Sequence, residues 1–253
     1  MAKVNARALG FAAVLSFALV LWGQTQAAIT LDFETEDDFT TPLVHGQDIS
    51  TPPEFGNWVI ISSSGAGHLG PAIFDSTNGP FGTDPDLNVG LGNILILQDS
   101  SSPTQTTSGI FDAPNDAASG GTIIFDFVSP AYLLSINLVD IDSGAQTTVT
   151  LTDGGGSTRV YNVPNDWTGE KSMTLAGWHT LDLTTLAPQP GPGTGGNATA
   201  TDYGLNPSDV RRLEVQFSGS AGVDGLVFIP EPATMLLAGL GFAVLALRFR
   251  KRR

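Results

Sequence analysis

The stretch TTVTLTDGGGSTRVY, residues 147–161, is the clearest indication of the fold class. Polar and apolar residues alternate through 147–151, which places successive side chains on opposite faces of an extended strand. Asp153-Gly154-Gly155-Gly156 follows, and such Gly-rich runs permit the positive φ angles of a tight hairpin. Residues 159–161 then resume the extended pattern. The segment therefore predicts two antiparallel strands joined by a hairpin.

Similar strand patterns recur on both sides of this hairpin. Together with 147–151, the predicted strands are 29–34, 58–61, 94–97, 122–127, 134–139, 178–183, 213–217 and 225–228. Turn-forming Gly, Pro, Asn and Asp separate them, and no long polar stretch has a helical period. We therefore expect residues 28–229 to form one all-β domain, a β-sandwich of jelly-roll type. Two irregular stretches, 78–92 and 188–200, are predicted to be loops, the second a flexible surface insertion.

The charge and composition of this body exclude several classes of partner and site. Between Ala28 and Pro230 the chain has 24 acidic residues and four basic ones, a net charge of about −20. Nucleic acid needs Lys and Arg to neutralise its phosphates, so it is excluded as a partner. The chain contains no cysteine, which excludes disulfides and thiolate metal sites. The histidines lack metal-ligand spacing and are predicted to be surface residues; they are His45, His68 and His179.

The N-terminus has the order of a secretory signal peptide. Lys3 and Arg7 precede an apolar run at 8–22, and small residues follow at Thr25 and Ala27. We predict a signal peptide over residues 1–27, with cleavage after Ala28 as the alternative site. A retained transmembrane helix is the competing interpretation.

The C-terminus has three parts in order: Pro230-Glu231-Pro232, an apolar run at 233–247, and a basic tail at 248–253. The run would form a helix about 22 Å long, somewhat short of a full membrane span of about 20 residues. Arg248 can extend it by reaching the interface. The basic tail should stay in the cytoplasm, which places the body outside the inner membrane. A transmembrane helix is therefore predicted at 233–247.

This tripartite end, residues 230–253, resembles the PEP-CTERM sorting signal of Gram-negative bacteria. The resemblance implies that Pro230, Glu231 and Pro232 form the sorting motif and that an exosortase-type enzyme processes the precursor. It further implies delivery from the inner membrane to the cell surface or the exopolysaccharide matrix of a biofilm. A simple tail anchor is the alternative. The two prolines are predicted to stop strand and helix alike, leaving an accessible extended peptide.

The body also resembles the ectodomains of other PEP-CTERM proteins. The segments that carry this resemblance are 31–34, 72–76, 82–87 and 223–226. Those ectodomains are similar to galactose-binding-like, carbohydrate-binding sandwiches. This resemblance implies a fold more than a function.

Calcium is the predicted cofactor, because it prefers carboxylate and carbonyl oxygens. Asp75, Asp84 and Asp86 lie in or beside a Gly/Pro loop, and Glu34 and Asp224 could form a second cluster if the terminal strands are neighbours. The spacing is not that of an EF-hand. Turn-forming aspartates that bond their own backbone are the competing interpretation.

Aromatic residues could provide a platform on which a sugar stacks. Trp167 is the preferred residue because it lies in a predicted loop, whereas Trp58 and Trp178 lie in predicted strands and should pack in the core.

Nothing in the chain forms a catalytic motif. There is no Gly-x-Ser-x-Gly elbow and no phosphate loop. Among 24 acidic residues, chance pairs of carboxylates carry little weight. We therefore expect a non-catalytic protein with a binding or structural role, and extracellular polysaccharide is the expected ligand of a binding role. The alternatives are an extracellular carbohydrate-active hydrolase and a purely structural coat protein.

Overall fold

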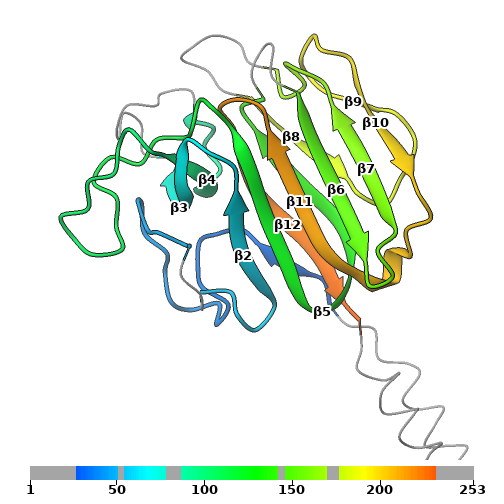
Figure 1. The fold of residues 1–253 in the computed structure, drawn as a ribbon, viewed down its shortest axis with the longest axis horizontal. Coiled ribbons are helices and arrows are strands. Elements are labelled where there is room, and N and C mark those ends of the chain that lie inside the picture. The colour runs from blue at the N-terminus through cyan, green and yellow to red at the C-terminus, as the bar shows by residue number, and fades with distance from the viewer. Residues whose placement is uncertain (1–26, 51–53, 78–86, 142–145, 170–176, 232–253) are drawn as a thin grey trace, which may run out of the picture. The chain divides into compact units, whose positions relative to one another are not determined.

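The computed structural model describes residues 27–50, 54–77, 87–141, 146–169 and 177–231. These residues form an all-β fold (Figure 1). Its elements are β1 (Ile29–Leu31), β2 (Val59–Ser64), β3 (His68–Asp75), β4 (Asn93–Asp99), β5 (Gly121–Val139), β6 (Thr147–Asp153), β7 (Thr158–Val163), β8 (Trp178–Asp182), β9 (Gln189–Pro190), β10 (Asn197–Asp202), the short 3-10 helix η2 (Pro207–Asp209), β11 (Val210–Phe217) and β12 (Gly222–Pro230).

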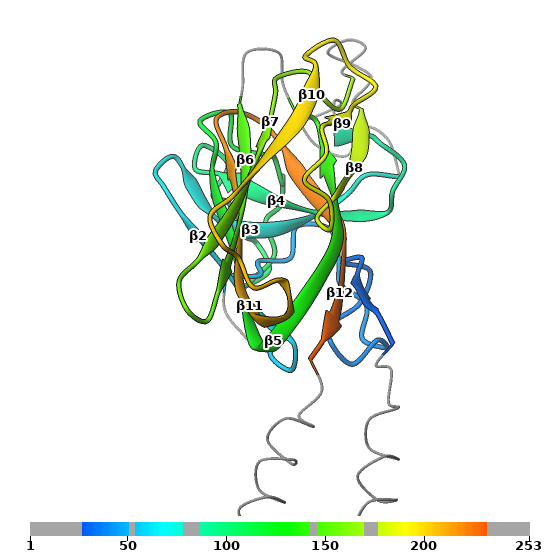
Figure 2. The same cartoon turned by 90° about the vertical axis from the view of Figure 1, so that its right-hand side faces the viewer.

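The strands form one antiparallel sheet that bends around β5. The order is β3-β4-β12-β5-β11-β6-β7-β10-β9, with β1 on β12 and with β2 and β8 on β5. Residues 121–127 of β5 pair with β2 and β11, whereas residues 135–139 pair with β8. Because β5 has 19 residues, its two halves belong to two groups of strands, which form two layers in the side view (Figure 2).

The main core lies between these layers. Strand β6 alternates buried and partly exposed residues along its length, and so does β7. Buried residues of the first group, such as Phe125, Val149 and Val215, belong to the same cluster as Ile136 and Val223 of the second group. Burying each large aliphatic or aromatic side chain contributes about 1.5–3 kcal/mol. The two strand groups therefore hold each other through one shared core.

A second apolar cluster covers the other face of β3 and β4. In β4, Ile94 and Ile96 face this cluster, whereas Leu95 and Leu97 face the main core. Leu87 is fully buried in the second cluster. The prediction of a loop over 78–92 is therefore incomplete, because its end supplies a core side chain; residues 78–86 lie outside the described part.

Most of the predicted strands are confirmed. The hairpin joins β6 to β7, with Thr152 opposite Thr158. The separate strands predicted at 122–127 and 134–139 are parts of the single strand β5. The strand predicted at 29–34 is too long, since β1 ends at Leu31 and Phe33 adopts a left-handed φ of 57°.

The prediction of a flexible insertion at 188–200 is wrong. This stretch contains β9 and most of β10, and β10 pairs with β7. Between them, glycine backbone lies directly on another backbone segment. A Cβ atom on Gly193 would lie 1.4 Å from the Asp166 carbonyl oxygen, and one on Gly195 would lie 1.5 Å from that of Asn165. The glycines allow this close approach rather than making the segment loose.

Residues Ala28–Ile229 form one compact unit, the first of two units in the chain. Every member of both apolar clusters lies in the first unit. That unit therefore has its own core and is expected to fold independently. Apart from Ala27, the predicted signal peptide lies outside the described residues, as does the predicted membrane helix at 233–247. Within the described ranges, we find no helix of the length and hydrophobicity needed to cross a membrane.

Candidate functional site

The predicted sorting residues follow directly from the last strand of the body. Pro230 is the final residue of β12 and is buried, and the partly exposed Glu231 comes next. Pro232 lies outside the described residues. The end of β12 at Pro230 agrees with the expectation that this proline stops the strand, since proline lacks the N–H donor that a further ladder hydrogen bond needs.

Asp224 is a buried carboxylate on the same strand. Its neighbour Val223 faces the main core, whereas Asp224 lies on the opposite face with 5% of its surface exposed. Asn137 Nδ2 donates a hydrogen bond to Asp224 Oδ2 at 3.4 Å, and Thr180 Oγ1 donates to Asn137 Oδ1 at 2.7 Å. Asp224 Oδ1 has no hydrogen-bond partner among the described residues.

The N-terminal segment brings two more carboxylates to Asp224. Strand β1 pairs with β12 so that Leu31 lies opposite Leu226. The next residues, Asp32 and Glu34, interact electrostatically with Asp224. Glu34 Oε1 also accepts the backbone N–H of Asn93 at 2.8 Å. Glu34 and Asp224, predicted as a cluster, are therefore near enough to interact electrostatically, and so is Asp32, which the sequence analysis does not single out.

The environment of Asp224 favours its uncharged form. Burial raises the pKa of this carboxyl group to about 7, and the charges of Asp32 and Glu34 act in the same direction. The backbone N–H of Gly225 and the Asn137 amide oppose the shift. Near neutral pH, this site therefore favours either a proton or a cation on Asp224.

The other predicted calcium residues are not gathered in the described part of the chain. Asp75 Oδ1 accepts hydrogen bonds from the Thr77 N–H at 2.9 Å and from the Thr77 hydroxyl at 2.6 Å. This is the turn-forming role that was the competing interpretation. Asp84 and Asp86 lie outside the described residues. Among the residues that are described, no three acidic or histidine side chains stand in an arrangement ready to hold a metal.

The aromatic residues exchange their expected roles. Trp167 is wholly buried, its Nε1 donates to the Gln189 carbonyl oxygen at 3.1 Å, and its ring packs on His179. It presents no face to a sugar, so the expected platform at Trp167 does not fit the structure. Trp178, expected in the core, is 41% exposed on β8. The loop pattern around Trp167 does not reveal its burial, because the residues that cover it belong to segment 189–195, later in the chain.

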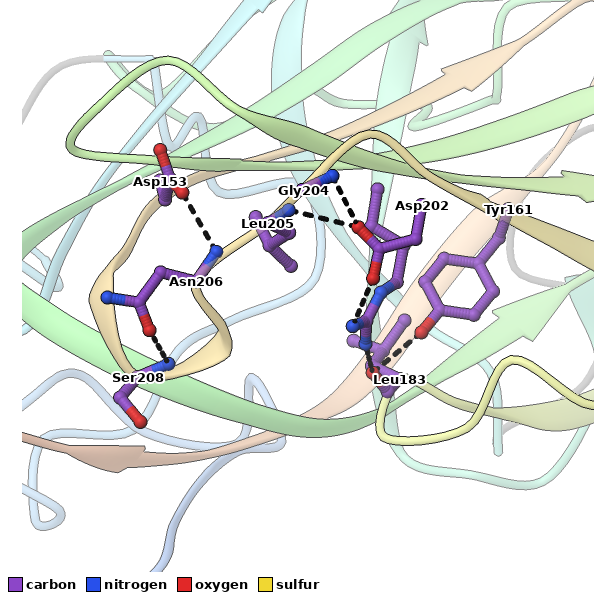
Figure 3. A network of polar contacts seen from close by, with 9 residues as sticks. Asp153, Tyr161, Leu183, Asp202, Gly204, Leu205, Asn206 and Ser208 are labelled. Atoms are coloured by element: carbon purple, nitrogen blue, oxygen red, sulfur yellow. Dashed lines mark hydrogen bonds and ion pairs between the residues drawn. The ribbon is translucent and has the colours of Figure 1, made fainter.

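A polar network joins β7 to the end of β10 (Figure 3). Arg159 is buried and pairs with Asp202 at 2.9 Å, and the Tyr161 hydroxyl donates to the Leu183 carbonyl oxygen at 2.6 Å. Asp202 Oδ1 accepts the backbone N–H groups of Gly204 and Leu205, each at 2.9 Å. The contact with Arg159 is the main reason that the pKa of Asp202 is lowered. The network therefore fixes the turn after β10.

The basic side chains of the body are largely committed to ion pairs. Besides Arg159, Arg211 pairs with Asp209 at 2.9 Å and Arg212 with Asp126 at 2.7 Å. The fourth, Lys171, lies outside the described residues. The arginines that the structure describes therefore form local pairs rather than a basic surface.

Comparison with known proteins identifies the C-terminal end. The family model of the PEP-CTERM protein-sorting motif matches residues 228–253. The match begins at Phe228, inside β12, and includes the sorting residues predicted from the sequence. The chain therefore carries a PEP-CTERM sorting motif, a type of domain that exosortases recognise. No curated protein and no solved structure matches the chain.

Proposed function

We propose that this PEP-CTERM protein is an exported component of the cell surface or the exopolysaccharide matrix, with a non-catalytic body that binds polysaccharide or has a structural role. The observation that carries the proposal is the sorting motif at 228–253, which follows a separately folded β unit. In this proposal the precursor is held in the inner membrane by residues 233–247, with the body outside the cytoplasm. An exosortase-type enzyme then processes it near Pro230-Glu231-Pro232.

The body is suited to such a location. It is folded around its own core, lacks cysteines and has a net charge of about −20. We propose that it is a jelly-roll, galactose-binding-like sandwich. The support for this architecture is the long β5, which is shared by two strand groups around one core.

Calcium is proposed as a structural ion beside Asp224. The support is a nearly fully buried carboxylate that lies near two others and has one oxygen without a hydrogen-bond partner among the described residues. A cation would offset both the loss of hydration that burial imposes on the carboxylate and its repulsion by the neighbouring acids. The side chains of Asp32 and Glu34, both exposed, would have to turn toward Asp224 to share the ion. The loop site with Asp75, Asp84 and Asp86 stays a prediction.

Replacing Glu231 tests the sorting proposal. Glu231→Ala should leave unprocessed precursor in the inner membrane of the native host, because the motif would no longer be recognised. Cell fractionation with intact-mass measurement reads this out, and Glu214→Ala, on β11, is the matched control. Unchanged mass and location in the Glu231 variant would leave a plain membrane anchor as the explanation of the tail.

A further inference from the structure

The outer face of one strand group carries a regular array of hydroxyl side chains. It is formed by β2, the first half of β5, β11, β6, β7 and β10, which face the viewer in Figure 1. We call it the threonine face. Its hydroxyl residues are Ser62, Ser64, Thr122, Thr148, Thr150, Thr152, Thr158, Thr199 and Thr201.

Strand register aligns these residues in rows. In the central row, Glu214 lies opposite both Ile124 and Thr150, Thr150 lies opposite Val160, and Val160 lies opposite Thr201. A parallel row runs through Thr122, Gln216, Thr148, Asn162 and Thr199. Neighbouring strands lie about 4.8 Å apart, and same-face residues along a strand are about 6.7 Å apart. The face is therefore a regular grid in which short polar side chains alternate with a few apolar, amide and charged ones.

The hydroxyl groups of this grid are accessible and can form hydrogen bonds with a ligand. None of the nine residues is buried. Within the described part of the chain, only the Thr148 hydroxyl makes a side-chain hydrogen bond, to Gln216 Oε1 at 3.3 Å. A threonine side chain presents a methyl group beside its hydroxyl, so the grid offers apolar contact and hydrogen bonding together.

The charges on the threonine face nearly cancel. At its paired positions the charged residues are Asp126, Arg212 and Glu214, and Asp126 and Arg212 form an ion pair; the exposed Arg211 at the bulge of β11 pairs with Asp209. The face thus has a net charge of about −1 on a body of about −20. An anionic polymer would be repelled by the rest of the body, and the face has no cluster of cations to attract it. The complementary partner is uncharged.

The apolar content of the face argues against a stable contact with a second copy. Its large apolar residues are Ile60, Ile124, Val128 and Val160, and no two of them are paired in the strand register. Obligate interfaces between copies instead resemble a divided hydrophobic core.

We propose that the threonine face binds a neutral polysaccharide lying flat across β5, β11, β6 and β7, which rests on the proposed polysaccharide-binding function and gives it a site. Sugar hydroxyls would bond to the threonine hydroxyls, and the C–H faces of the sugar rings would rest on their methyl groups and on Ile124 and Val160.

The test uses the unit Ala28–Ile229, which contains both apolar clusters. Its retention is measured on insoluble microcrystalline cellulose and on the neutral and acidic fractions of the host's own matrix polysaccharide. Thr150→Lys places a long charged side chain in the middle of the grid and should weaken retention on the neutral polymers at least tenfold. Thr104→Lys makes the same change at an exposed loop position and should not alter it.

A second variant separates loss of binding from loss of folding. Thr150→Val keeps the shape and the β-branched side chain but removes the hydroxyl, so it should fold normally and still weaken retention several-fold. Urea unfolding of each variant checks the fold. Equal weakening by Thr104→Lys and Thr150→Lys, or retention on acidic polymers alone, would overturn the proposal.

The outcomes also distinguish this site from the broader function. If wild type is retained and only Trp178→Ala releases it, the threonine-face proposal is wrong while polysaccharide binding stands. If wild type is retained on no polymer, polysaccharide binding itself is wrong. If sedimentation shows a dimer that Thr150→Lys dissociates, and no polymer is held, the face is a self-association surface and the proposal is overturned.

Discussion

At the scale of single residues, two buried ionisable groups, Arg159 and Asp224, have contrasting environments. Arg159 has a carboxylate partner in Asp202 and a carbonyl partner in Leu183. Asp224 has a weak amide contact and nearby charges of its own sign. A buried charge is tolerated when it is paired and hydrogen-bonded, so the protein alone compensates the charge of Arg159, although its Nε has no hydrogen-bond partner among the described residues. Asp224 favours a proton or an added cation.

Asp202→Asn tests the Arg159 pair. The amide keeps an acceptor for the turn but leaves the buried guanidinium without an anionic partner, so the free energy of unfolding should fall by about 1 kcal/mol. Because the pKa of Asp202 is lowered in the folded state, its contribution is present above the ordinary value and is lost as the pH falls below about 4. Urea unfolding between pH 3 and 7 measures both effects. Asp209→Asn, in the exposed pair with Arg211, is the control and should change little.

Asp224→Asn tests the proposed calcium ion. With calcium about 100-fold above its dissociation constant, wild type should gain about 2.7 kcal/mol over the chelated protein. The variant should lose that gain. In chelator at pH 8, above the raised pKa of Asp224, the variant should be at least as stable as wild type, because no charge is then buried. Melting temperatures that do not respond to chelator in wild type would contradict calcium binding.

At the scale of elements, two segments connect parts of the molecule that the sequence separates. β5 contributes to both strand groups, and its neighbour β12 carries Asp224 and ends at Pro230. The segment 189–195 closes over Asn165, Asp166 and Trp167 by direct backbone approach. The first arrangement is held by the shared apolar core, whereas the second depends on glycine positions that allow the backbones to meet.

Gly193→Ala tests this close approach. The added methyl group would overlap the Asp166 carbonyl oxygen, so backbone must shift and the unfolding free energy should fall by about 1–3 kcal/mol. Trp167 fluorescence should change, although Trp58, Trp178 and the tryptophan near the N-terminus also contribute to a full-chain spectrum. Gly155→Ala is the control, since its nearest neighbour is a side-chain atom at 3.3 Å. Equal stability of the two variants would mean that the segment adapts freely.

At the scale of the whole molecule, acidic charge and neutral hydroxyl surface are segregated. The excess of about 20 negative charges favours solubility outside the cell and opposes binding of anionic polymers. The threonine face lies on the strand group of β2, β11, β6 and β7, whereas Asp224 lies on the group that includes β12. The proposed polysaccharide site and the proposed ion site are therefore carried by different strand groups and can be tested independently.

The sequence by itself determined the features that depend on neighbouring residues. Alternation of period two located the β6–β7 hairpin and β11, because side-chain direction in a strand is set locally. The order of motif, apolar run and basic tail identified the sorting signal, because its three parts are consecutive in the sequence. The sign of the body's charge also followed from composition alone.

Only the tertiary structure decided what depends on residues far apart in the chain. Trp167 became a core residue because residues 189–195 cover it, and Thr199 belongs to the threonine face because β10 pairs with β7. The sequence suggested that Glu34 and Asp224 lie near each other only if the first and last strands are neighbours. The pairing of β1 with β12 meets that condition. Burial, strand register and the environment of a carboxylate are properties of packed neighbours, and a single local pattern does not encode them.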